Sequence, residues 1–107
     1  MKEAAVEKRL RDRLTAHGFK VLKLTTPGTQ FTPDRLILRP VWSPGPPWVI
    51  EIKRPGKVER RGQELVRIDW RERGVLVLDM VDTYEKVDIL VSELCQICFD
   101  TRYGDAS

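Results

Sequence analysis

The chain has 107 residues, of which 41% are hydrophobic and 33% are charged, and its formal net charge at pH 7 is +3. This length suits one small domain, so we expect residues 1–107 to form a single domain with its core within about residues 3–94. No apolar run approaches the ~20 residues that cross a bilayer, and the amino terminus predicts a charged helix instead of a signal peptide. We therefore expect an intracellular protein with no membrane partner.

The first predicted element is a helix over residues 3–17. Val6, Leu10 and Leu14 recur at helical spacing and form one apolar stripe, and Gly18 lies just past the end, where glycine commonly terminates a helix. Three apolar runs then predict strands, at residues 19–24, 35–39 and 48–53.

The second half of the chain predicts two helices around a short buried strand. Residues 60–73 are charged with helical periodicity, residues 75–78 predict the strand, and apolar residues from Tyr84 to Leu94 predict the last helix. Prolines between residues 40 and 47 make a loop that closes a hairpin. The order αβββαβα predicts an α/β fold with a mixed central sheet flanked by helices, in which the 60–73 helix forms a crossover to a parallel strand.

The candidate site is formed by Pro33-Asp34 and Glu51-Ile52-Lys53. Mg²⁺ prefers oxygen ligands and keeps several waters, so two carboxylates and a substrate phosphate suffice to hold it. Side chains alternate along a strand, which puts Glu51 and Lys53 on one face, where lysine could orient a water or offset charge on the phosphorane. Taken singly these motifs are weak, because Pro-Asp commonly starts a turn and an alternating Glu and Lys is common on half-exposed strands.

The joint pattern is stronger, because the chain resembles the PD-(D/E)xK nucleases and, within them, the VRR-NUC family (virus-type replication-repair nuclease) over about residues 3–90. The matching pieces are Glu3 and Glu7 on the first helix, His17-Gly18-Phe19, Lys23, Pro27-Gly28, Pro33-Asp34-Arg35-Leu36, residues 49–56 (VIEIKRPG), Gln63 and Gly74-Val75. The resemblance implies the restriction-endonuclease-like αβββαβ core.

The resemblance also implies an activity and roles for individual residues. It implies a Mg²⁺- or Mn²⁺-dependent endonuclease that cuts branched DNA such as four-way junctions or flaps, acts as a homodimer, and works in the cytoplasm of a bacterial or phage-infected cell. Asp34 and Glu51 would ligate the metal and Lys53 would assist attack. Gln63 would fix water or a phosphate oxygen. Either Glu3 or Glu7 would support the metal, and we favour Glu7 because it precedes Gly18-Phe19 by about three turns.

One position departs from the family. VRR-NUC proteins usually have glycine directly before or one residue before the Pro-Asp pair, and this chain has Phe31-Thr32 there. The geometry of the turn before Asp34 is therefore not carried over. The proline-rich loop at residues 40–47 is also longer than expected, so substrate contacts in that region are not carried over either.

The charges are unevenly distributed along the chain, in a way that suits a nucleic acid. Residues 1–23 carry seven Lys or Arg against three acids and residues 53–61 five against one, whereas residues 79–107 carry two against seven. A basic front half suits a phosphate backbone, although such charges are also common on solvated helix faces. The candidate phosphate contacts are Lys23, Arg35, Arg54 and Lys57.

Nothing in the sequence predicts base reading. The three tryptophans are explained by packing, since no groove-reading helix or sheet of stacking aromatics is evident, so recognition by backbone and shape is expected. Two other functions remain open. One is a non-catalytic DNA-binding or assembly module with the nuclease fold, and the other is a sequence-specific restriction-type cutter.

Cys95 and Cys98 form a lone C-x-x-C within an apolar stretch. A structural zinc site would need two further ligands, and His17 is the one histidine and lies far away in sequence. We expect reduced thiols that pack as small apolar side chains.

Overall fold

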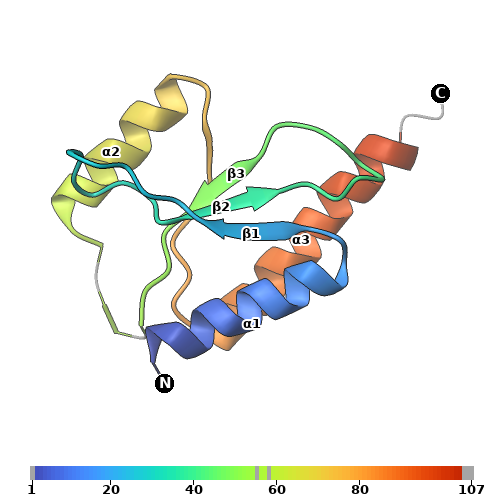
Figure 1. Cartoon of the computed structure of the whole chain (residues 1–107), viewed down its shortest axis with the longest axis horizontal. Coiled ribbons are helices and arrows are strands. Elements are labelled where there is room, and N and C mark those ends of the chain that lie inside the picture. The colour runs from blue at the N-terminus through green and yellow to red at the C-terminus, as the bar shows by residue number, and fades with distance from the viewer. Residues whose placement is uncertain (1, 55, 58, 105–107) are drawn as a thin grey trace.

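The computed structural model describes residues 2–54, 56–57 and 59–104, which form the predicted order of three helices and four strands (Figure 1). The predicted α/β class and the element order are confirmed. The elements are α1 (Glu3–Ala16), β1 (Lys20–Lys23), β2 (Arg35–Leu38), β3 (Trp48–Ile50), α2 (Arg61–Glu72), β4 (Leu76–Val77) and α3 (Tyr84–Tyr103).

The four strands form one mixed sheet in the order β1-β2-β3-β4. The β1–β2 and β2–β3 pairs are antiparallel, and β3 pairs with β4 in parallel, so the predicted crossover through α2 is confirmed. The strands are shorter than predicted. β3 ends at Ile50, and beyond it the parallel pairing continues only as a bridge between Ile52 and Val81. The predicted strand over residues 48–53 is therefore too long at its carboxyl end, and Arg54 lies beyond it.

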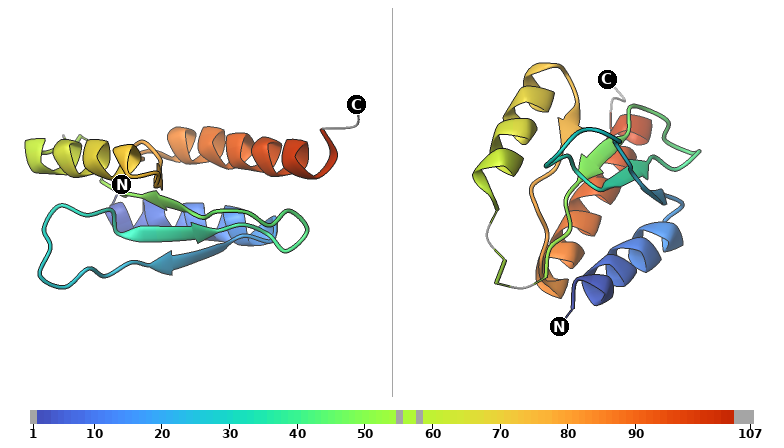
Figure 2. Two further views of the ribbon diagram at one scale, coloured as in Figure 1. Left: turned by 90° about the horizontal axis from the view of Figure 1, so that it is seen from above. Right: turned by 60° about the vertical axis from the view of Figure 1, so that its left-hand side comes forward.

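The hydrophobic core lies on one side of the sheet, between the sheet and the helices α1 and α3 (Figure 2). The predicted stripe of α1 is completely buried, and the sheet contributes Ile37 of β2 and the alternate residues Trp48 and Ile50 of β3 to this core. The buried residues of this core are Val6, Leu10, Leu14, Phe19, Ile37, Trp48, Ile50, Ile52, Val81, Val87, Leu90, Val91, Leu94 and Cys98.

Helix α2 is attached differently. It lies on the opposite side of the sheet from α1, beside β4, and contributes no buried residue (Figures 1 and 2). Its guanidinium groups contribute to the attachment: Arg71 donates hydrogen bonds of 2.9 and 2.6 Å to the carbonyl of Val77, and Arg67 lies 3.4 Å from the Asp79 carboxylate just after β4. Polar contacts and half-buried side chains therefore hold α2, whereas completely buried apolar side chains hold α1 and α3.

The last helix continues to Tyr103, well past the predicted end of the core at residue 94. Cys98 is buried in the core and Cys95 is half-buried, and neither forms a disulfide. The hydroxyl of Ser43 donates a 2.7 Å hydrogen bond to the carbonyl of Cys98, which fastens the proline-rich loop to α3. The part of α3 beyond residue 94 therefore belongs to the fold. Across the described ranges, no helix is both long and apolar enough to cross a membrane.

Candidate active site

Asp34 lies immediately before β2 and is held by backbone hydrogen bonds to both neighbouring strands. Its N–H donates to the carbonyl of Ile50 at 3.2 Å, and its carbonyl accepts from the N–H of Leu24 at 2.9 Å. The side-chain Oδ1 accepts from the N–H of Ile52 at 3.3 Å, which turns the carboxylate toward the end of β3. The position of Asp34 thus follows from the pairing of three segments of the sheet.

Glu51 and Lys53 follow β3 and are fixed by one backbone partner, Val81. The N–H of Val81 donates to the carbonyl of Glu51 at 3.3 Å, and the N–H of Lys53 donates to the carbonyl of Val81 at 2.9 Å. Between them, Ile52 is buried in the core, so Glu51 and Lys53 point to the other side. The Lys53 ammonium lies 3.6 Å from Glu51 Oε1, as the alternation of strand side chains predicts.

The two carboxylates lie in a partly desolvated and mutually repulsive environment. The pKa of Glu51 is raised to about 7, first because burial disfavours its charged form and second because the Asp34 carboxylate repels it, while Lys53 acts in the opposite direction. Burial likewise raises the pKa of Asp34, and the neighbouring Arg35 guanidinium opposes this shift. A positive ion between the carboxylates would stabilise both charged forms.

The first helix presents its two glutamates differently. Glu7 is largely buried and forms ion pairs with Arg11 at 3.3 Å and Arg35 at 3.7 Å. Glu3 is exposed, yet its charge contributes to the raised pKa values of both Asp34 and Glu51. The contacts of Glu7 are therefore with arginines, whereas Glu3 is the helix glutamate that adds a small repulsion to both site carboxylates. The metal-supporting role of Glu7 stays a prediction.

Arg35 lies among these acids and not on an open surface. Its guanidinium donates to the carbonyl of Asp34 at 2.9 Å and lies 3.4 Å from Asp34 Oδ2, besides pairing with Glu7. These contacts link α1 to the start of β2. A phosphate contact by Arg35, which the sequence predicted, would have to share this guanidinium with two carboxylates.

Gln63 reaches the site from the first turn of α2. Its Oε1 accepts from the backbone N–H of Arg60 at 3.0 Å, which caps the helix start, and its Nε2 donates a long 3.5 Å hydrogen bond to Glu51 Oε1. One amide therefore joins α2 to the predicted catalytic carboxylate. The site is thus made from four segments: residue 34, residues 51–53, the start of α2 and the first turn of α1.

The other predicted phosphate contacts are exposed side chains. Lys23 lies on the edge strand β1 directly opposite Arg35 in the pairing register, and Arg54 and Lys57 precede α2. The N–H of Lys57 donates to the carbonyl of Arg54 at 3.2 Å, so these two residues share one turn. Their contacts with nucleic acid stay predictions.

Sequence reasoning gave no role to Phe31. Its φ is +64°, in the left-handed region that glycine occupies freely and bulky residues rarely adopt. The missing family glycine at this turn was the signal that could have found it. The Phe31 side chain lines an open hollow together with Glu51 and Gln63.

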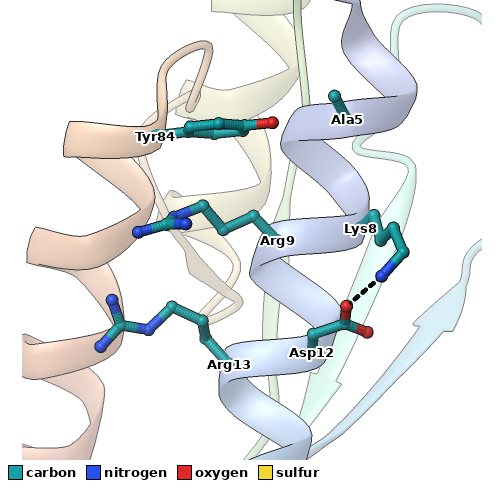
Figure 3. A pocket seen from close by; sticks show the side chains of 6 residues that line it. All are labelled: Ala5, Lys8, Arg9, Asp12, Arg13 and Tyr84. Carbon is teal, nitrogen blue, oxygen red and sulfur yellow. Dashed lines mark hydrogen bonds and ion pairs between the residues drawn. The ribbon is translucent and has the colours of Figure 1, made fainter.

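A second cluster of charged residues lies between α1 and α3 (Figure 3). Arg9 and Arg13 extend toward α3, where Arg9 pairs with Asp88 at 2.8 Å and Arg13 with the same carboxylate at 2.7 Å. Arg9 also stacks over the ring of Tyr84 at 4.8 Å. These cations already have carboxylate and aromatic partners, so the cluster ties the two helices together.

The donor set of the candidate site fits a hard divalent cation. Asp34 and Glu51 offer only oxygen atoms, and burial together with mutual repulsion makes their charged forms unfavourable without a counter-ion. Among the residues that the structure describes, no cluster of three or more His, Cys, Asp or Glu side chains is arranged to hold a metal ion. The fit is therefore to two carboxylates, with water and substrate oxygens as the remaining ligands.

Comparison with known proteins identifies the family. A solved structure described as a VRR_NUC domain is 30% identical to this chain and superposes with a TM-score of 0.73, covering 86% of this chain and 96% of that one. The chain belongs to the VRR-NUC family. No family model and no curated protein sequence matches the chain. The VRR-NUC fold therefore emerges from the three-dimensional comparison, and it is a nuclease fold, as the sequence resemblance implied.

Proposed function

We propose that this VRR-NUC protein is a Mg²⁺- or Mn²⁺-dependent DNA endonuclease that hydrolyses phosphodiester bonds in branched DNA. The observation that carries the proposal is the Lys53 ammonium 3.6 Å from Glu51, with Asp34 held beside them by the end of β3. Two carboxylates and a lysine in this arrangement suit the metal-assisted hydrolysis of a phosphodiester bond.

Asp34 and Glu51 would hold the metal, with Glu7 or Glu3 supporting it from α1. A bound Mg²⁺ or Mn²⁺ supplies Lewis-acid polarisation of the phosphate and lowers the pKa of water. Lys53 would orient the attacking water or offset charge on the phosphorane. The Gln63 amide, whose Nε2 already donates to Glu51, would keep that carboxylate turned toward the site.

The proposed substrate class is branched DNA that is bound through its backbone. The exposed cations around the site, which include Lys23, Arg54 and Lys57, suit phosphate contacts that carry no sequence information. One chain offers one candidate site, so paired cuts on two strands would require two subunits related by a two-fold axis. We therefore propose a homodimer as the active form.

The decisive experiment is cleavage of end-labelled four-way junction, flap, linear duplex and single-stranded DNA with Mg²⁺, Mn²⁺ or EDTA. We expect metal-dependent cutting of the branched substrates, and we expect Lys53→Ala to reduce it by on the order of 100-fold or more because a charge-stabilising group is lost. Light scattering of the protein with and without junction DNA would measure the proposed dimer.

Lys20→Ala is the control, because Lys20 is an exposed lysine that lies at the far end of β1, opposite Leu38. Lys20→Ala removes one positive charge, as Lys53→Ala does, and this variant should cleave branched DNA nearly as fast as wild type. DNA binding without cutting under every metal would favour the non-catalytic module. Equal cutting by Lys53→Ala, with the fold intact, would contradict the assigned role of Lys53.

A further inference from the structure

Phe31 has an unfavourable backbone conformation in this structure. Its φ of +64° lies in the left-handed region, which is unfavourable for a bulky residue. The side chain is also 40% exposed, so burial of the ring offsets only part of this strain. A conformation of this kind persists only where neighbouring contacts hold it.

The contact that holds the ring is Gly62, in the first turn of α2. A Cβ atom built on Gly62 would lie only 2.5, 2.6 and 2.8 Å from three carbon atoms of the Phe31 ring, so any side chain at this position would displace the ring. The ring therefore lies directly on the helix backbone. Phe31 and Gly62 fit each other as a pair.

The next residue along α2 is Gln63, whose amide donates to Glu51. Helix α2 has no buried residue of its own, so few apolar contacts determine where its first turn lies. Phe31 supplies one such contact directly beside Gln63, and the same ring lines the hollow formed with Glu51 and Gln63. The position of the amide thus depends on the ring.

We infer that Phe31 is a positioning residue, which holds the start of α2 through Gly62 so that Gln63 stays against Glu51. Its catalytic consequence rests on the proposed nuclease function, whereas its effect on Gln63 does not. VRR-NUC proteins usually have a glycine at this turn, where this chain has Phe31-Thr32. In this chain the turn before Asp34 carries a side chain that fixes the neighbouring helix.

The first test uses NMR and requires no cleavage. The chain has three glutamines and no asparagine, so three side-chain NH₂ groups are expected, and Gln63→Ala identifies the one from Gln63. In wild type we expect the Gln63 NH₂ group to be ordered, with slower local motion than that of exposed Gln30. In Phe31→Gly, which suits the positive φ but lacks the ring, we expect it to become as mobile as Gln30.

The second test is a double-mutant cycle on cleavage. We expect Phe31→Gly to lower kcat by on the order of 10-fold with little change in KM, and to have less than about a twofold effect in the Gln63→Ala background, because Phe31 acts through Gln63. Phe31→Tyr keeps the ring and should retain activity. Gly62→Ala, which displaces the ring from the other side, should reproduce the loss.

Trp42→Ala is the control, because Trp42 is also 40% exposed but lies in the proline-rich loop at the other end of β2 and β3. It should change neither readout. An unchanged Gln63 NH₂ group in Phe31→Gly, or an equal loss of kcat with and without Gln63, would overturn the inference. An absence of cleavage by wild type, with a Gln63 group that still loosens in Phe31→Gly, would contradict the nuclease proposal alone.

Discussion

Different interactions hold the helices on the two sides of the sheet. On one side α1 and α3 bury the stripe Val6, Leu10 and Leu14 against the sheet, and these three side chains have no exposed surface. On the other side α2 contains no fully buried residue, and its contacts with β4 and the residues after it include those of Arg71 with Val77 and of Arg67 with Asp79. The predicted catalytic groups Glu51 and Gln63 lie on this second side. The protein thus concentrates its stability away from its candidate site, which can carry repulsive charges and a strained turn without unfolding.

The largest expected effect is a loss of folding stability, which should differ between the two sides of the sheet. Leu10→Ala removes a fully buried side chain and should lower the free energy of unfolding by about 2–5 kcal/mol. Leu65→Ala on α2 is the matched variant, because Leu65 is 49% exposed, and it should cost less than about 1 kcal/mol. Urea unfolding followed by circular dichroism measures both. Equal losses would mean that α2 belongs to the same core as α1.

The second prediction concerns the pH dependence of stability in EDTA. The pKa of Glu51 is about 7 in the folded chain and its ordinary value is 4.5, so the folded state keeps its proton at pH values where the unfolded chain has lost it. The resulting stabilisation is present below pH 4.5, declines as the pH rises to 7 and is absent above that. The difference corresponds to roughly 3 kcal/mol at most.

Glu51→Gln removes this titration and therefore isolates it. The variant should match wild type near pH 4.5 and exceed it in stability at pH 8, as measured by chemical denaturation at both pH values in EDTA. Added Mg²⁺ should then raise the unfolding midpoint of wild type and leave that of Glu51→Gln nearly unchanged, because a ligand stabilises the state that binds it. A parallel pH dependence in both proteins would contradict the burial of Glu51.

The smallest expected effect is on the Mg²⁺ requirement for cleavage, and it compares the two glutamates of α1, Glu3 and Glu7. Glu3 acts on the pKa values of both site carboxylates, whereas Glu7 is paired with Arg11 and Arg35. We expect Glu3→Gln to raise the Mg²⁺ concentration for half-maximal cleavage on the order of 10-fold, and Glu7→Gln to raise it less. The reverse order would support the role of Glu7 that the sequence favoured. Unchanged half-maximal concentrations in both variants would exclude α1 from metal support.

Much of the fold was predictable from local pattern. The stripe of α1, the three apolar runs and the proline-rich loop are short-range features, because helix and strand periodicity follow from backbone geometry. The ends of the elements were less predictable. β3 ends at Ile50, the residue paired with Arg35 at the start of β2, and α3 continues to Tyr103, past Cys98, which packs in the core.

The helices, the order of the elements along the chain and the closeness of Glu51 to Lys53 follow from local sequence, since strand geometry puts residues two apart on the same face. Which groups reach that pair from remote parts of the chain depends on the tertiary fold. The approach of Gln63 to Glu51, the arginine partners of Glu7 and the ring of Phe31 on Gly62 all join segments that are remote along the chain. Their positions depend on how α1 and α2 pack on the sheet, and no local periodicity encodes that packing.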